Sequence, residues 1–296
     1  MSKILIDGEY YLKNIQLKNK NNNFLRIIKE VNNFSKKLYW KSYLDIKYLF
    51  YYLFYKKNIV KKNISMLCIT RERTIGFERL LINIIKRTKD ISRIEFLFLI
   101  DYDDKLKKKY KNLLKKYKKY FTIKMYINRI IKLNSERINF LAEKSKGDIL
   151  FSVSDDMIIQ TKNWDSLIDV ESSKFLNNSP YCLWPSVDAN KYKFLHCAFP
   201  IINRKWFEIL KYHSYPKFYH FYTDTWICEL SKLSGRFLLL KKLFIKTFHP
   251  EINKKYADKT YFRLRKNSKN YNDKIIFYKH KNIRKRHAQK LILAVH

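Results

Sequence analysis

Residues 149–164 read ILFSVSDDMIIQTKNW, an apolar run that stops at two adjacent carboxylates and then becomes apolar again. The first part has the length and the apolar content of a buried β-strand. Asp155 and Asp156 follow it, and neighbouring carboxylates repel each other unless a cation lies beside them. The stretch therefore suggests a cation at a strand end. The alternatives are that the pair caps the next segment or pairs with some of the lysines.

The residues around this stretch alternate between strand and helix patterns. Apolar runs typical of buried strands are ISMLCIT (64–70), RIEFLFLID (93–101), FTIKMYI (121–127) and DILFSVS (148–154). Apolar residues at helical spacing separate these runs at 71–90, 105–120 and 134–148. Strands that alternate with helices predict parallel crossovers, and hence an α/β fold with a mostly parallel sheet flanked by helices.

Polar and charged residues stand at the ends of three of these strands. They are Thr70 with Arg71 and Arg73, Asp101 with Asp103 and Asp104, and Asp155 with Asp156. The carboxyl ends of parallel strands meet at one edge of a sheet, where ligands bind, so we expect these side chains to converge on one site. Carboxylates at such an edge suit Mg²⁺ or Mn²⁺, which complete their shells with water and substrate phosphates.

The chain is strongly basic, with 63 Lys and Arg against 26 Asp and Glu and a formal net charge of +37 over 296 residues. Such a charge attracts phosphate polymers and anionic lipid surfaces. Lys, Asn, Ile, Tyr and Phe are over-used together, however, as they are in proteins encoded by AT-rich genomes. Lys also far outnumbers the Arg that base-edge recognition favours. We therefore interpret most of the charge as composition bias.

Features of targeting and redox state point to the cytoplasm. The opening residues MSKILIDGEYYLKN carry charge too early and too often for a signal peptide. The longest uncharged aromatic run, YLFYYLFY (48–55), is shorter than the roughly 20 residues of a membrane-spanning helix. Four cysteines without CxxC spacing predict buried, reduced thiols. We expect a cytoplasmic protein, with peripheral contact at the inner face of the membrane left open.

Three segments are predicted along the chain. Residues 1–62 form an N-terminal helical extension, because aromatic and aliphatic residues recur there at three- and four-residue intervals. Residues 63–262 form the α/β domain. Residues 263–296 form a basic, partly helical C-terminal tail, which either binds anionic lipid headgroups or packs on the core.

The strand-end motifs resemble those of the family 2 glycosyltransferases, which have the GT-A fold, from about residue 64 to 262. The stretch TRER (70–73) stands in the place of the family's Arg-containing loop after the first strand. Asp101, in LIDYDD, stands where the family has an acidic residue that contacts the nucleoside. The resemblance thus implies that these strand ends bind a nucleotide-sugar donor.

The opening stretch carries the most specific part of the resemblance. KGDILFSVSDD (146–156) is similar to the Gly-Asp, the fourth strand and the D-x-D type motif that holds a divalent metal and the donor diphosphate. Ser154 stands where the first Asp of that motif is expected. The resemblance therefore implies that Asp156 is a metal ligand, and it assigns Asp155 a donor-binding role.

The second half of the domain continues the resemblance. Asp224, in FYHFYTDTWICEL (218–230), stands at a helix start where the family keeps its catalytic base. His249 follows FLLLKKLFIKTF (237–248) at a strand end where related enzymes supply a further metal ligand. The simpler interpretations are that Asp224 is only a helix N-cap and that His249 is an ordinary strand-end residue.

The resemblance implies an inverting, metal-dependent glycosyltransferase that moves a sugar from a nucleotide-diphosphate sugar to an acceptor hydroxyl. It implies Mn²⁺ or Mg²⁺ as cofactor, a glycan or lipid-linked acceptor, and a role in surface glycan or lipopolysaccharide synthesis. The implied site residues are the base Asp224, the metal ligands Asp156 and His249, and the donor-binding Thr70, Arg71, Arg73, Asp101 and Asp155.

Three alternatives remain at this point. The acceptor could be nucleic acid, such as modified bases of viral DNA, although the basic runs lie away from the predicted site. A GT-A-like nucleotidyltransferase shares the strand-end carboxylates, but a chain with 4 Gly has no Gly-rich phosphate loop. A non-catalytic binding domain is the third. Residues 172–195 and 212–222 are expected to be loops, and they carry no readable code for the sugar or the acceptor.

Overall fold

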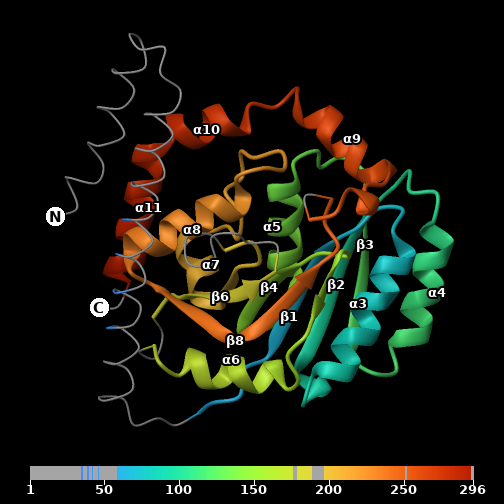
Figure 1. Cartoon of the computed structure of the whole chain (residues 1–296), viewed down its shortest axis with the longest axis horizontal. Helices are drawn as coiled ribbons and strands as arrows, with labels where there is room; N and C mark the ends of the chain where they lie inside the picture. Colours follow the sequence, from blue (N-terminus) through green and yellow to red (C-terminus); the bar gives the residue numbers. More distant parts are fainter. Residues whose placement is uncertain are drawn as a thin grey trace. The chain divides into compact units, whose positions relative to one another are not determined.

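The computed structural model describes residues 59–175, 179–188, 197–250 and 252–294, together with four isolated residues nearer the N-terminus (Figure 1). Those four, Ser35, Tyr39, Ser42 and Ile46, are helical. Residues 59–62 at the end of the predicted extension 1–62 are described and are not helical, and the rest of the extension, including the aromatic run 48–55, lies outside the described residues. The chain divides into two compact units, 1–47 and 48–296, and the fold and site below belong to the second.

The second unit is built on one eight-stranded sheet with the order β3-β2-β1-β4-β7-β6-β8-β5. Neighbouring strands are parallel from β3 to β4 and between β6 and β8, whereas β7 and β5 run antiparallel to their neighbours. The strands are β1 (Ile64–Ile69), β2 (Ile94–Asp101), β3 (Thr122–Asn128), β4 (Ile149–Val153), β5 (Met157–Ile159), β6 (Cys182–Val187), β7 (Ile201–Asn203) and β8 (Phe237–Thr247). The predicted α/β fold with a mostly parallel sheet is thereby confirmed.

Helices cover both faces of the sheet (Figure 1). One buried layer joins alternate strand residues, such as Met66 and Phe96, to Phe77, Tyr110 and Trp164 of α3, α4 and α6. These helices are α3 (Thr74–Arg87), α4 (Lys107–Tyr117) and α6 (Trp164–Ser172). The other face is covered by α5 (Asn134–Lys144), α7 (Arg204–Leu210) and α8 (Thr223–Ser234).

Strand β6 corrects the expectation of a loop over residues 172–195. Its six residues, CLWPSV, lie between β7 and β8, and five of them are buried. Pro185 weakens the strand pattern because proline cannot donate to a β-ladder. The structure accommodates it at an irregularity between Pro185 and Ser186, where the register with β8 shifts.

The C-terminal residues form three successive helices, α9 (Lys259–Ser268), α10 (Asp273–Lys279) and α11 (Lys281–Leu293). Helix α9 spans the predicted boundary at 262/263, and α11 packs against α7 and α8. None of the helices within the described part of the chain is long and apolar enough to cross a membrane. The four cysteines are all buried.

A buried ion cluster holds the amino ends of β1 and β2 against α6. The Arg93 guanidinium donates to Asp165 at 2.9 Å and to Asp169 at 3.1 Å, and also to the Lys62 carbonyl at 2.7 Å. The Asp165 carboxylate, which is fully buried, additionally accepts the backbone N–H groups of Lys89 and Asp90. The Asp165 carboxylate thus ties residues 89–93 to α6, and Arg93 and Asp169 connect Lys62 to the same cluster.

Removing that carboxylate should destabilise the fold strongly. Asp165→Ala removes one of the two buried carboxylates that pair with Arg93 and leaves two backbone N–H groups without their acceptor. Removal of one member of a buried ion pair costs about 3–5 kcal/mol. Urea unfolding at equilibrium measures the loss. Glu143→Ala, at an exposed position of α5, is the matched control and should change stability by less than about 0.5 kcal/mol. Equal stability of the two variants would contradict the assignment.

Candidate active site

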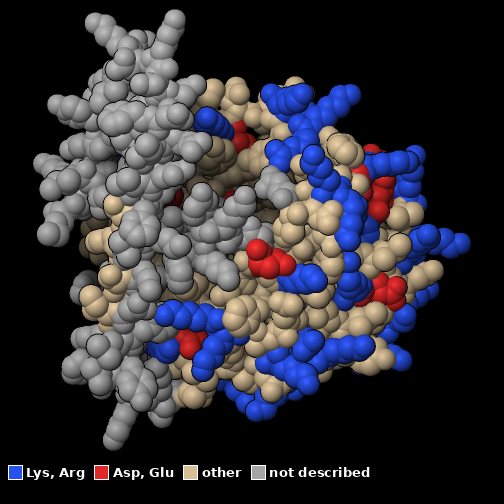
Figure 2. Space-filling view, in the orientation of Figure 1, with Lys and Arg blue, Asp and Glu red and all other residues tan. Residues whose placement is uncertain are grey.

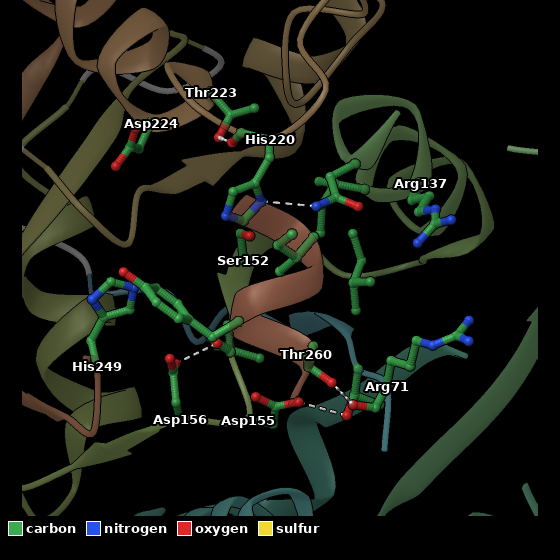
Figure 3. A pocket seen from close by; sticks show the side chains of 18 of the residues that line it. Arg71, Arg137, Ser152, Asp155, Asp156, His220, Thr223, Asp224, His249 and Thr260 are labelled. Carbon is green, nitrogen blue, oxygen red and sulfur yellow. Dashed lines mark hydrogen bonds between the residues drawn. The ribbon is translucent and has the colours of Figure 1, made fainter. Parts of the chain in front are cut away.

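All eight predicted site residues line one pocket of about 500 Å³ beyond the carboxyl ends of β1, β2 and β4. They are Thr70, Arg71, Arg73, Asp101, Asp155, Asp156, Asp224 and His249. In Figure 3, Asp156 and His249 lie on one side of the pocket and Arg71 on the opposite side, with Asp224 on a third side. Residues from distant parts of the sequence therefore converge as the strand order requires.

Sheet register explains why the strand-end residues meet. Cys68 pairs with Val153 and Ile69 pairs with Leu99. Two residues further along, the same register brings Thr70 beside Asp155 and Arg71 beside Asp101. The Thr70 hydroxyl donates to the Asp155 carboxylate at 2.6 Å, and the Arg71 guanidinium donates to Asp101 at 2.9 Å.

Asp155 is buried and fully engaged by protein groups. Its side chain is 3% exposed, and Arg73 donates to its second oxygen at 3.1 Å. Burial raises the pKa of Asp155 to about 6, Arg73 opposes the rise, and Asp156 next to it adds to the rise. Asp155 therefore holds the loop 70–73 through hydrogen bonds from Thr70 and Arg73. A contact between Asp155 and the donor stays a prediction.

Asp156 and His249 are brought to one side of the pocket by strand pairing. Met157 of β5 pairs with Thr247 of β8, and one step beyond, the Phe248 N–H donates to the Asp156 carbonyl at 2.6 Å. His249 follows directly. The Asp156 carboxylate itself accepts the Ser154 hydroxyl, so the serine that replaces the expected aspartate orients this carboxylate.

The donor atoms on this side fit a divalent cation that is only partly held by protein. Within the described ranges, no three His, Cys, Asp or Glu side chains gather as a complete metal site. Asp156 and His249 offer one carboxylate and one imidazole. Mg²⁺ and Mn²⁺ are typically bound by one or two carboxylates together with water and substrate phosphates. The residues present therefore fit such an ion when a diphosphate supplies further oxygens.

On the opposite side of the pocket, aspartate and arginine side chains alternate in one cluster. Asp101 accepts hydrogen bonds from Arg71 and from the Asn128 amide at 3.0 Å, and it forms an ion pair with Arg137 at 2.9 Å. Arg71 also binds Asp103 with both terminal nitrogens. Asp101, for which the resemblance implies a nucleoside contact, is thus positioned by two arginines at the pocket wall.

Arg73 connects the strand ends to the C-terminal helices. Its Nε and one terminal nitrogen donate to the Asp258 carboxylate at 2.6 and 2.8 Å. Asp258 also caps α9 by accepting the Tyr261 N–H, and the Thr260 hydroxyl donates to the Arg71 carbonyl. Both arginines of the TRER loop are therefore engaged by carboxylates, and each needs to exchange partners before it can bind a diphosphate.

Asp224 lies in the first turn of α8 without acting as its N-cap. The helix begins at Thr223, its N-cap is Tyr222, and that residue caps with no side-chain hydrogen bond. One Asp224 oxygen accepts the Thr225 N–H at 2.7 Å. The simpler interpretation of Asp224 as a helix cap is therefore wrong, and the pocket position is compatible with a base role.

Two non-glycine residues beside the pocket have left-handed backbone conformations. Glu72, inside TRER, has φ of 54°, and Tyr222, just before Asp224, has φ of 65°. Such conformations are unfavourable for bulky residues and tend to occur at functional loops. The Glu72 N–H donates to Asp104, and Asp273 of α10 accepts the N–H groups of residues 219–221. Buried carboxylates thus hold both loops.

The sequence did not reveal several pocket residues. Tyr261, Arg263 and Arg265 reach the pocket from α9, within or next to the segment that was interpreted as a tail. His220 lies in the loop before α8, where burial lowers its pKa, and its Nδ1 lies 2.9 Å from the Asn134 amide nitrogen. In the sequence, His220 could have been found as a candidate from its position four residues before Asp224.

Solved structures resemble the described domain. PcManGT, a mannosyltransferase from Pyrobaculum calidifontis solved with GDP-Man and Mn²⁺, superposes with a TM-score of 0.53 at 8% identity, covering 71% of this chain and 67% of that one. GalNAc-T7, solved with UDP, GalNAc and Mn²⁺, superposes with a TM-score of 0.53 at 15% identity, covering 65% of this chain and 44% of that one.

No protein-family model matches the sequence, and no curated protein matches it either. At identities of 8% and 15%, the likeness to the two solved enzymes is one of fold. The expected fold is confirmed: the described domain has the GT-A fold of nucleotide-sugar glycosyltransferases.

Proposed function

We propose that this protein is a metal-dependent, inverting glycosyltransferase that moves a sugar from a nucleoside-diphosphate sugar to an acceptor hydroxyl. The observation that carries the proposal is the convergence of Asp156, His249 and Asp224 in one pocket at the carboxyl edge of a GT-A sheet. The two solved structures with this fold were determined with Mn²⁺ and a nucleotide or nucleotide sugar, which supports the same ligand class here.

Residues on different sides of the pocket have different roles in the proposed reaction. Asp156 and His249 would hold a divalent ion, which when bound neutralises charge on the departing diphosphate. Asp101, between Arg71 and Arg137, faces the same pocket and offers a carboxylate to the nucleoside. Asp224 accepts the proton of the acceptor hydroxyl as general base, and direct attack by that oxygen on the anomeric carbon inverts its configuration.

We favour a glycan or lipid-linked acceptor over nucleic acid. On the face shown in Figure 2, Lys and Arg lie in many separate places on the described surface and do not gather in one groove, which fits composition bias better than a nucleic-acid site. Residues 259–294 contain one acidic residue, Asp273, and it is buried. Contact of this basic segment with an anionic membrane surface would bring a lipid-linked acceptor within reach, as surface glycan or lipopolysaccharide synthesis requires.

The metal role of Asp156 is tested by Asp156→Asn, which keeps the side-chain size and removes the charge. Because a metal ligand is lost, we expect Mn²⁺-dependent release of nucleoside diphosphate from UDP- and GDP-sugars to fall about 100-fold or more. Glu208→Gln, at an exposed position of α7, makes the same change of charge and should leave turnover unchanged. Full turnover by Asp156→Asn would refute the metal assignment.

The base role of Asp224 is tested separately, because donor binding should survive its loss. Asp224→Asn should lower kcat by about 10²- to 10⁴-fold, the usual contribution of a general base. The dissociation constant of the donor with Mn²⁺, measured by calorimetry, should stay the same. Glu229→Gln, on the same helix α8, is the control. An unchanged kcat would exclude Asp224 as the base, and loss of donor binding would assign it a binding role instead.

A further inference from the structure

Three residues of α3 face the turn that carries Asp155 and Asp156. Gly76, Arg79 and Asn83 follow each other at intervals of three and four residues, so they lie on one face of the helix. That face packs against β5, which begins directly after the carboxylate pair. None of the three is among the predicted site residues.

Each of these residues contacts backbone of the turn or of β5. The Asn83 amide accepts the Ile159 N–H at 2.7 Å and donates to the Ile159 carbonyl at 3.0 Å. The Arg79 guanidinium donates to the Asp155 carbonyl at 3.3 Å. At Gly76 the Asp155 carbonyl comes so close that an added Cβ would lie 2.6 Å from its oxygen. The peptide bond between Asp155 and Asp156 thus packs against α3.

Arg79 also contacts the strand end that carries His249. Its guanidinium lies 3.8 Å from the centre of the Phe248 ring, the distance of a cation–π contact. The Phe248 N–H in turn donates to the Asp156 carbonyl at 2.6 Å. One side chain therefore touches the residue before Asp156 and the residue before His249, the two side chains that would hold the cation.

We infer that Arg79, assisted by Gly76, is a positioning residue that sets the separation of Asp156 and His249 and thereby the affinity for the divalent cation. The inference rests on the proposed function, in which these two side chains are the metal ligands. Neither Arg79 nor Gly76 lines the pocket, so they act through the backbone that they contact.

The direction in which Mn²⁺ affinity changes when Arg79 is replaced distinguishes a positioning role from a purely electrostatic one. Arg79 carries a positive charge near both carboxylates, since Asp156 and Asp155 act on it electrostatically. Coulomb repulsion alone predicts that removal of this charge strengthens the binding of Mn²⁺. Positioning predicts the opposite result, because two ligands that are no longer held at a fixed separation bind a cation less well.

The experiment is an electron paramagnetic resonance titration of Mn²⁺ into the full chain with UDP or GDP, whichever the wild type binds. Arg79→Met keeps the aliphatic stem and removes the guanidinium, and we expect about 10- to 100-fold weaker Mn²⁺ binding, as for other groups that orient metal ligands. Lys86→Met removes the same charge from an exposed position of α3 and should leave the affinity unchanged. Thermal unfolding verifies that both variants are folded.

Gly76→Ala provides a test without any change of charge. The added methyl group displaces the Asp155 carbonyl, so Mn²⁺ affinity should fall here as well. This variant decides the matter if Arg79→Met does not fold. Unchanged or tighter Mn²⁺ binding in the folded variants would overturn the positioning role, whereas a wild type that binds no Mn²⁺ with either nucleotide would overturn the proposed function itself.

Discussion

The buried carboxylate of Asp155 is the interaction on which the architecture of the site depends. It accepts the Thr70 hydroxyl from the end of β1 and the Arg73 guanidinium from the loop beyond it. Arg73 extends the connection to Asp258, the residue that caps α9. A charge that costs free energy to bury is thereby compensated by two partners from the segment 70–73, and one of them, Arg73, links that segment to Asp258.

This arrangement separates the two members of the acidic pair. Asp155 is buried and bonded to Thr70 and Arg73, while Asp156, oriented by Ser154, lies on the side of the pocket that carries His249. Two adjacent carboxylates without such separate partners would repel each other strongly. Ser154, which stands in place of the first Asp of the expected D-x-D pattern, contributes to this arrangement because its hydroxyl donates to the Asp156 carboxylate.

The sequence predicted those parts of the molecule that depend on local pattern. Strands β1 to β4 and the helices between them follow from apolar runs and helical spacing, and parallel pairing then places Thr70, Asp101 and Asp155 at one edge. The rest depends on contacts distant in sequence. Pro185 interrupts the strand pattern of β6, and Arg93 joins segments more than seventy residues apart. Helix α9 is held at the pocket by the pairing of Arg73 with Asp258 and by the hydrogen bond from Thr260 to Arg71.

The central claim is that this pocket binds a nucleoside-diphosphate sugar together with a divalent cation. A thermal-shift panel of UDP-, GDP-, dTDP- and CMP-sugars, each with Mn²⁺ and with a chelator, tests it most directly, because a ligand that binds the native state raises the unfolding temperature. We predict a manganese-dependent rise with at least one of the diphosphate sugars. No rise with any member of the panel would contradict the account and favour a binding domain that shares only the fold.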